Sequence, residues 1–412
     1  ISPVIEPRLR KEQSGFRRGK SCVDQINTLR IITEQCRELN APLCLLFVDF
    51  ERAFDSLDQR IMWKILSKYG IPEKLVDIIR ELYDDAFLKV VHRGQVGSGF
   101  RVTSGVKQGC VLSPLLFNVI LDFVLRLATQ TSRGIQWDSP HSKLLDLDYA
   151  DDIVVMTPTM TEMSGFVNDL VKYAAIVGLK INVGKTKLLR INTPTRFTRS
   201  TNAEPQVLMI NEEAIEQVND FIYLGSVITN GGGSDEDVQR RITLANVAFG
   251  SMNHVWRSHR LSLKLKLRLF RSNVMSVLLY GSETWRVVQS LTRKLQVFVN
   301  KCLRKICGIF YPDKITNVEL HQKTNQQPVG EIILKRKWRW IGHTLRKPPE
   351  DICRKAMTWN PPGRRGKGKP KITWQRSVRT EAEQQGKNWK EVASLADNRA
   401  DFERFVNALH FL

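Results

Sequence analysis

The feature that most constrains this chain is a pair of adjacent carboxylates, Asp151 and Asp152, that follow Tyr149 and Ala150. Residues 143–148 before this pair and the β-branched run 153–155 after it are typical of two strands, so the acids lie at the tip of a predicted hairpin. Adjacent like charges in a tight turn repel each other unless a divalent cation lies between them. Asp also favours turns by bonding its own backbone, so this tetrapeptide alone fits an ordinary turn as well as a metal site.

A third carboxylate, Asp49, decides between these readings. It ends the nearly continuous apolar run 43–48, which is typical of a strand buried on both faces. If this strand and the hairpin share one sheet, Asp49 reaches the turn at Asp151 and Asp152. Three carboxylates supply enough oxygen ligands for two Mg²⁺ ions, with Mn²⁺ as an alternative, beside substrate phosphates. The pattern therefore favours phosphoryl transfer.

The segment after Asp49 predicts a helix from Leu57 to Tyr69. Gly70 stands just past its end, and Asp55 or Ser56 is the expected N-cap, so we interpret Asp55 as a helix cap and not as a metal ligand. Further predicted helices cover residues 22–39 and 161–177, the latter stopped by a glycine, and a helix that begins at Pro114 with Ser113 as its cap. Strands are expected at 87–91 and 221–228.

Six blocks occur in a fixed order along the first part of the chain. They are residues 12–17 (EQSGFR), 48–55 (VDFERAFD), 104–114 (SGVKQGCVLSP), 149–152 (YADD), 178–187 (GLKINVGKTK) and 221–225 (FIYLG). In their order and in their amino-acid sequences, these blocks resemble a fingers segment, polymerase motifs A, B, C and D and the primer grip of the reverse transcriptases of non-LTR (LINE-type) retrotransposons. Residues 279–285 (LYGSETW) also resemble a block common in this group.

The resemblance implies an α+β right-hand polymerase with partial fingers, a palm of antiparallel sheet and helices, a helical thumb and a basic C-terminal region. We expect fingers and palm in residues 1–190, a connector and the primer-grip strands in 191–234, the thumb in 235–310 and the basic region in 311–412. The implied activity is RNA-directed DNA synthesis from a DNA primer 3′-end with dNTPs. The glycine-rich loop 230–234 is the expected hinge before the thumb.

Site residues follow from the same resemblance. Asp49, Asp151 and Asp152 match the metal ligands, and Lys185 or Lys187 is the candidate general acid for pyrophosphate, with Lys185 preferred. Expected substrate contacts are the Phe50 carbonyl, Phe54 as a steric gate against ribonucleotides, Gln108 and Gly109 at the incoming nucleotide, and Tyr149 and Ala150 at the primer end. Phe54 is equally interpretable as a core side chain, and the two lysines as ordinary exposed residues.

Charge supports a polyanionic partner. The formal net charge is +21 and the isoelectric point about 9.8, which favours RNA, DNA or an anionic membrane surface. No run of 18 or more apolar residues occurs, which argues against a membrane span. Seven scattered cysteines favour reduced thiols, and hence an intracellular location in nucleus and cytoplasm and not secretion.

Residues 330–380 carry the densest charge, with 15 Lys or Arg against three acids, interleaved with Trp338, Trp340, Trp359 and Trp374. Basic side chains neutralise phosphates and exposed indoles stack on unpaired bases, so this region is a predicted nucleic-acid surface. The alternative is that the tryptophans fill a small core. Residues 361–370, rich in Gly, Pro, Arg and Lys, are expected to form a flexible basic loop on phosphates.

Two departures from the family accompany these matches. An upstream endonuclease domain and an Arg-Pro-Ile-type fingers block that holds the triphosphate are absent, and the chain begins with Ile, so we interpret it as N-terminally truncated. Arg8, Arg10 and Lys11 are the candidates to compensate at the triphosphate. The alternative function is a truncated remnant that binds RNA or DNA without polymerising. The sequence determines neither the RNA that is copied nor the oligomeric state.

Overall fold

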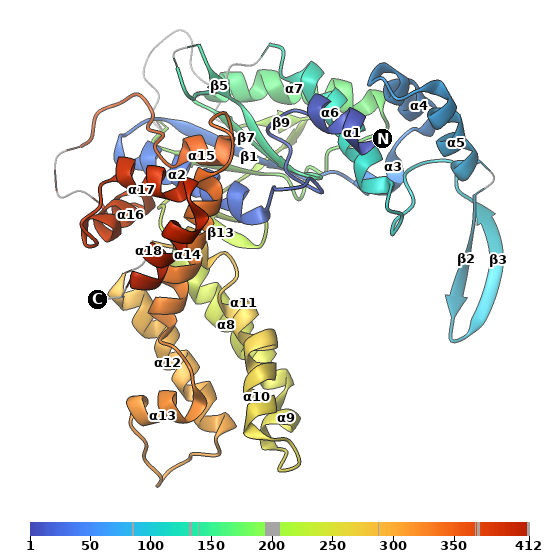
Figure 1. The fold of residues 1–412 in the computed structure, drawn as a ribbon. Coiled ribbons are helices and arrows are strands. Elements are labelled where there is room, and N and C mark those ends of the chain that lie inside the picture. Colours follow the sequence, from blue (N-terminus) through green and yellow to red (C-terminus); the bar gives the residue numbers. More distant parts are fainter. Residues whose placement is uncertain are drawn as a thin grey trace. The chain divides into compact units, whose positions relative to one another are not determined.

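The computed structural model describes residues 1–84, 86–131, 134–139, 141–193, 207–286, 288–366, 368 and 371–409. The chain forms two compact units (Figure 1). Unit 1 comprises residues 1–25, 39–221 and 361–366, and unit 2 comprises residues 26–38, 222–360 and 367–412. These units do not follow the four expected zones, because residues 26–38 and most of the C-terminal region contribute to unit 2. The assignment of fingers, palm and thumb to residue ranges stays a prediction.

Unit 1 contains the sheet that carries the acids. Its helical segments are α1 (Ser2–Ile5), the 3₁₀ turn η1 (Glu6–Arg8), α3 (Ala53–Ser56), α4 (Gln59–Lys68), α5 (Glu73–Tyr83), α6 (Ser113–Ala128) and α7 (Met160–Ile176). Its strands are β1 (Leu43–Val48), β2 (Phe87–His92), β3 (Gln95–Arg101), β4 (Ile135–Gln136), β5 (Lys143–Leu144), β6 (Asp146–Tyr149), β7 (Asp152–Thr157), β8 (Lys187–Ile191), β9 (Met209–Ile210), β10 (Glu213–Ala214) and β11 (Glu216–Val218). Two further elements, α2 (Cys22–Glu38) and β12 (Asp220–Tyr223), continue from unit 1 into unit 2.

The main sheet has the strand order β11-β8-β1-β7-β6, and every neighbouring pair is antiparallel except β11 with β8. All residues of the central strand β1 are buried, as its unbroken apolar sequence predicts. Alternate residues of β1 and β7, including Leu46, Val48 and Val155, share one core with α4, α5, α6 and α7. In Figure 1, α6 and α7 lie on the same side of β1 and β7. This packing fixes where the two strands end, and so where their acids lie.

The hairpin β2–β3 differs from the rest of unit 1. The expected strand at 87–91 is present, but every residue of both strands is exposed, and the hairpin extends away from the main sheet (Figure 1). A two-stranded sheet with no buried face gains little from the hydrophobic effect and is stabilised mainly by its own ladder. Between Ala86 and Leu121 the sequence contains no acidic residue.

Helix caps correct two expectations. The helix expected from Leu57 begins at Gln59, and its N-cap is Asp58, whose carboxylate accepts hydrogen bonds from two backbone N–H groups; Asp55 and Ser56 instead lie in the short α3. The extended Leu57 separates α3 from α4. The helical spacing of the apolar residues continues across this break and so does not indicate it. Ser113 is also not a cap: it is the first residue of α6, and its hydroxyl donates to the Lys107 carbonyl. Pro in the first turn of α6 and Gly178 after α7 are confirmed.

Unit 2 is mainly helical. Its elements are β13 (Ser226–Thr229), α8 (Asp235–Ser251), α9 (Asn253–Arg257), α10 (Leu263–Leu269), the π-helical η2 (Phe270–Met275), α11 (Ser276–Leu278), the 3₁₀ turn η3 (Ser282–Thr284), α12 (Gln289–Ile306), α13 (Asn317–Thr324), α14 (Val329–Leu345), α15 (Ile352–Ala356), α16 (Trp374–Glu383), α17 (Trp389–Asp397) and α18 (Arg399–Ala408). The run at 263–269 alternates with a period of two but is helical, as its Leu, Lys and Arg content favours. The single strand expected at 221–228 is wrong: a turn at Leu224 and Gly225, both with positive φ, divides it into β12 and β13.

The C-terminal tryptophans form a core and not a stacking surface. Trp338, Trp359 and Trp374 are buried, and Trp340 packs edge-on against Trp374. The Trp338 indole donates to the Glu381 carboxylate, which also pairs with the fully buried Lys337. The expectation of exposed indoles is therefore wrong for Trp338, Trp359 and Trp374, whose apolar area is buried inside unit 2, while Trp340 is half-buried. Residues 361–366 and 368 contain no helix or strand, as expected; positions 367, 369 and 370 lie outside the described residues.

Candidate active site

Three carboxylates meet where β1 ends and the β6–β7 hairpin turns. In the β1–β7 ladder Val48 pairs with Ile153, and continuing this register by one residue puts Asp49 opposite Asp152. Tyr149 pairs with Asp152, so Ala150 and Asp151 form the turn itself. Asp49 and the two hairpin acids thus come from neighbouring strands of one sheet. The predicted convergence of Asp49 with the Asp151–Asp152 turn is present in the fold.

Asp49, Asp151 and Asp152 form an acidic corner, in which the negative charges repel one another. Burial by the surrounding protein and repulsion from Asp49 raise the pKa of Asp151. The same burial, followed by repulsion from Asp151 and then from Asp49, raises the pKa of Asp152 to about 6. One carboxylate oxygen of Asp49, Oδ1, is buried and accepts no hydrogen bond from the residues that the structure describes. A cation placed here would reduce the repulsion among the carboxylates and would give the buried Asp49 oxygen a partner.

The donor set suits a divalent ion, although its present geometry is not a formed cage. Within the described ranges, no group of three or more His, Cys, Asp or Glu side chains is arranged to hold a metal ion as it stands. Asp49, Asp151 and Asp152 nevertheless provide hard oxygen ligands at one corner, which is what Mg²⁺ prefers. We conclude that these side chains fit the metal chemically.

The pKa of Asp152 gives a test that needs no activity measurement. The pKa of Asp152 is raised from 3.8 to about 6 in the folded chain. The protonated carboxyl of Asp152 therefore contributes fully to the free energy of unfolding below about pH 3.8, and this contribution is lost as the pH rises through about 6. Asp152→Asn removes the charge that causes this loss. In EDTA above pH 7 we expect this variant to melt about 1–3 °C higher than the wild-type chain, a small shift because Asp152 is only partly covered and solvent screens the repulsion. Thermal melts at pH 5 and pH 7.5 measure it. An equal or lower melting temperature of the variant at both pH values would contradict the repulsion.

Lys185 lies beside Asp49. Its Nζ is 3.8 Å from Asp49 Oδ1, and its side chain is 69% exposed. The turn that carries it is attached to the end of β1, because the Asn182 N–H donates to the Asp49 carbonyl and the Asp49 N–H donates to the Thr186 hydroxyl. Lys187, the other candidate, pairs with Glu216 and donates to the Gly184 carbonyl. Lys185 is therefore the lysine that faces the acids.

Phe50 and Phe54, two of the expected substrate contacts, lie just after β1. Phe50 is buried in the core and forms an isolated bridge with Ile181. Phe54 is half-buried and stacks on Phe117 at 4.4 Å between ring centroids, so its ring has a packing role whether or not it also excludes a 2′-hydroxyl. The Phe54 carbonyl accepts a hydrogen bond from Val106, which ties this segment to the block at 104–114.

Gln108 and Gly109 lie on an exposed turn of that block. The Gln108 amide donates to Asp55 Oδ1 at 2.9 Å, so Asp55 holds this turn and does not cap a helix. Gly109 has φ +86°, a conformation that favours glycine, and the space where a Cβ would lie is open. Among the described residues, no hydrogen bond or ion pair joins this turn to the three acids.

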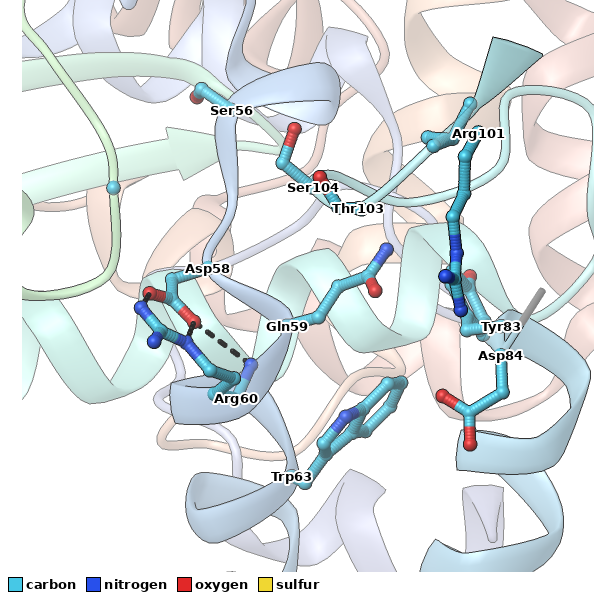
Figure 2. Close-up of a pocket in the computed structure, with 12 residues that line it drawn as sticks. Ser56, Asp58, Gln59, Arg60, Trp63, Tyr83, Asp84, Arg101, Thr103 and Ser104 are labelled. Atoms are coloured by element: carbon cyan, nitrogen blue, oxygen red, sulfur yellow. Dashed lines mark hydrogen bonds and ion pairs between the residues drawn. The ribbon is translucent and has the colours of Figure 1, made fainter. Parts of the chain in front are cut away.

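A pocket of about 590 Å³ lies beside the same block, within unit 1. Figure 2 shows Asp58 and Arg60 bonded to each other on one side of it, with Trp63 below and Arg101 opposite. The Gln59 amide donates to the Gly105 carbonyl and so connects the pocket wall to the 104–114 block. None of the three acids lines this pocket, so it is distinct from the site of the acids.

A buried ion cluster lies in the strand that leads to the turn. Arg10 pairs with Asp146 and Asp148 of β6, and its backbone N–H donates to Asp122 of α6. Burial alone would lower the pKa of Arg10, but attraction to Asp146 and Asp148 raises it. Burial and repulsion from Asp146 raise the pKa of Asp148. The expectation that Arg10 compensates at a triphosphate is therefore wrong, since its guanidinium is used inside unit 1.

Arg8 is engaged as well. Its guanidinium donates to the Tyr69 carbonyl at the end of α4. Among the described residues, Lys11 forms no ion pair with the three acids. Sequence reasoning missed Arg10 and Gln13 as residues that shape the site, because their partners lie more than a hundred residues further along the chain.

Comparison with known proteins agrees with this geometry. Residues 1–228, more than half of the chain, match the reverse transcriptase (RNA-dependent DNA polymerase) family, and residues 248–280 match a domain of unknown function. The chain therefore belongs to the reverse transcriptase family, and its mixed α+β fold is that of a right-hand polymerase. Among the described residues, no helix is both long and apolar enough to cross a bilayer.

The curated relatives described below are named as proteins of transposable elements. The chain is 28% identical over 247 residues to a transposon-derived protein of Caenorhabditis elegans, covering 58% of this chain and 85% of that protein. It is 26% identical over 223 residues to the polyprotein of the type-2 retrotransposable element R2DM of Drosophila melanogaster, covering 53% and 21%, respectively. It is 22% identical over 337 residues to the RNA-directed DNA polymerase of the mobile element jockey of Drosophila funebris, covering 78% and 34%. The resemblance to LINE-type reverse transcriptases is confirmed; the chain spans only a fifth to a third of the last two proteins.

Solved structures give a weaker similarity. Apo telomerase from Candida tropicalis matches with 14% identity and a TM-score of 0.41, covering 86% of this chain and 59% of that chain. Telomerase from the same organism in complex with a fragment of telomeric RNA matches with 14% identity and a TM-score of 0.36, covering 84% and 53%. Similarity at this level supports no argument about the site.

Proposed function

We propose that this chain is the RNA-directed DNA polymerase of a non-LTR retrotransposon, which extends a DNA primer 3′-end with dNTPs on an RNA template. One observation carries the proposal: in a chain of the reverse transcriptase family, Asp49 and the Asp151–Asp152 turn come together at the ends of neighbouring strands. The net charge of +21 suits a template–primer duplex as partner.

Each residue of the corner has a proposed role. Asp49, Asp151 and Asp152 would hold two Mg²⁺ ions, which when bound lower the pKa of the primer 3′-hydroxyl and neutralise the leaving pyrophosphate. Lys185, close to Asp49 and mostly exposed, would donate a proton to the pyrophosphate. Its position on a turn bonded to the end of β1 keeps it beside the acids.

Substrate contacts are proposed around these groups. Tyr149 and Ala150 would face the primer end, and the Phe50 carbonyl would complete the ligands. Gln108 and Gly109 would border the incoming nucleotide, where the open space at Gly109 permits close approach of a ligand to the backbone. Phe54 would act as the steric gate from its place against Phe117.

Primer extension tests the proposal. We expect the wild-type chain to elongate a labelled DNA primer on an RNA template with dNTPs and Mg²⁺, and EDTA to stop the reaction. Asp151→Asn serves as the catalytic control. If the wild-type chain binds the template–primer in a gel shift but adds no nucleotide at any Mg²⁺ or Mn²⁺ concentration, the chain is the binding remnant and the proposal is wrong.

A further inference from the structure

The segment 12–16 runs along β6 toward the acidic turn. The Asp148 N–H donates to the Glu12 carbonyl at 3.2 Å, and the Ser14 N–H donates to the Asp148 carbonyl at 2.8 Å, so the segment pairs with the edge of the main sheet as an isolated parallel bridge. This contact brings Gln13 next to the turn between β6 and β7.

The Gln13 side chain holds the turn by its backbone. Its Oε1 accepts hydrogen bonds from the Ala150 N–H at 2.9 Å and from the Gly15 N–H at 2.7 Å, while its Nε2 donates to the Ala150 carbonyl at 3.3 Å. Both backbone polar groups of Ala150 thus bind one amide. Gln13 is only 2% exposed, so water does not compete for these bonds.

Ala150 needs such a restraint. It has φ +57°, a left-handed conformation that costs free energy for a residue with a Cβ and persists only where the surroundings enforce it. Ala150 directly precedes Asp151 and Asp152, so the orientation of its two peptide planes sets the direction in which these carboxylates leave the turn. The neutral amide of Gln13 offers an acceptor oxygen and a donor nitrogen on one planar group, whereas an ionised carboxylate could only accept.

Close packing fixes the segment against the turn. A Cβ on Gly15 would lie 2.2 Å from the backbone N of Ala150, which no rotamer can relieve. Asn118 of α6 donates to the Gly15 carbonyl at 2.8 Å and anchors the segment from the helical side. Gln25, 4% exposed, donates to the carbonyls of Glu12 and Asp148 and to the Ser14 hydroxyl, and none of these three bonds goes to Ala150.

We propose that Gln13 is a positioning residue of the reaction: its amide holds the Ala150 peptides so that Asp151 and Asp152 point at the metal ions. This inference rests on the proposed function for its catalytic consequence. It acts through the backbone of the turn and not through contact with substrate, and errors of about 1 Å in such a constellation are costly. Residues that orient metal ligands typically contribute about 10–100-fold to affinity or activity.

The test compares two buried amides. Gln13→Met removes three hydrogen bonds at nearly constant volume, including both to Ala150; Gln25→Met also removes three, all from the same part of the fold but none to Ala150. We expect Gln13→Met to lower kcat about 10–100-fold with KM for dNTP and primer within about 3-fold. We expect Gln25→Met to lower the melting temperature by a similar amount to Gln13→Met but to keep kcat within about 3-fold.

A second readout does not depend on activity. In the wild-type chain, saturating Mg²⁺ should raise the melting temperature by about 2–5 °C, and this rise should persist in Gln25→Met and fall below about 1 °C in Gln13→Met. Gly15→Ala, which leaves the Gln13 amide in place and displaces the turn by a Cβ contact, should also lose the Mg²⁺ response. The two variants disturb the same peptide by different means.

The outcomes separate this inference from the proposed function. Equal losses of kcat and of Mg²⁺ response in Gln13→Met and Gln25→Met would reduce Gln13 to a structural residue and overturn the inference. A wild-type chain that responds to Mg²⁺ but does not extend primers contradicts the polymerase proposal, while the thermal melts still decide the role of Gln13. A wild-type chain with neither property overturns both.

Discussion

Substitution of Asp151 by Asn is expected to slow primer extension by about 10³-fold or more, equivalent to about 4 kcal/mol of lost transition-state stabilisation. Asn has nearly the same shape but no charge, so the corner keeps Asp49 and Asp152 and loses the ligand at the apex of the turn. Single-nucleotide incorporation under single-turnover conditions measures the effect. Folding should not suffer, because repulsion from Asp49 contributes to the raised pKa of Asp151 and Asn removes that repulsion.

Glu51→Gln is the matched control for this experiment. Glu51 lies two residues after Asp49 and pairs at the surface with Lys180, with 45% of its side chain exposed, so removing its charge changes the local potential without touching the corner. We expect its extension rate to stay within about 2-fold of the wild-type rate. Binding of the template–primer should be retained in both variants. An Asp151→Asn chain that keeps more than about a tenth of the activity would exclude Asp151 as a metal ligand.

The parts of the site that the sequence predicts are those with local signals. The apolar run 43–48 predicts a buried strand and the β-branched residues after Asp152 predict a second one, but that the two strands pair in one sheet was only a condition of the prediction, which the structure meets. The end of α7 is equally local, because Gly178 stands just beyond it; its N-cap, Thr159, was not predicted.

Other parts depend on contacts that no local pattern contains. The N-cap of α4 is Asp58 and not Asp55 or Ser56, because the extended Leu57 separates α3 from α4. The spacing of the apolar residues does not reveal this break. In residues 330–380, tryptophans are interleaved with basic residues, and this composition is the same whether the indoles are exposed for stacking or buried in a core. The sequence therefore did not distinguish the two cases, and Trp338, Trp359 and Trp374 are buried. Gln13 and Arg10 are polar residues in an irregular segment, and their roles appear only when β6 folds against them.

Loss of Arg10 is expected to cost unit 1 much of its stability. Asp146 and Asp148 are buried beside it, and Arg10 donates to both carboxylates, with one bond to Asp146 Oδ1 at 3.1 Å. Arg10→Ala leaves two buried carboxylates without their shared cation, which is expected to cost about 3–5 kcal/mol in the free energy of unfolding. Arg10→Lys keeps the charge but not the planar fork, so its cost should be intermediate. Urea unfolding of both variants measures the difference.

Arg60→Ala supplies the comparison that makes this result specific. Arg60 also pairs with an aspartate, Asp58, but its side chain is 88% exposed, so its removal should leave the free energy of unfolding nearly unchanged. The cost of Arg10→Ala should also depend on pH, because its unpaired carboxylates can take up protons: stability lost at pH 7.5 should be partly recovered toward pH 5. Because β6 leads directly into the turn at Ala150, the Arg10→Ala variant, if it stays folded, should also show a smaller rise in melting temperature with Mg²⁺. Equal costs for Arg10→Ala and Arg60→Ala would mean that the cluster is hydrated in solution and does not support the catalytic turn.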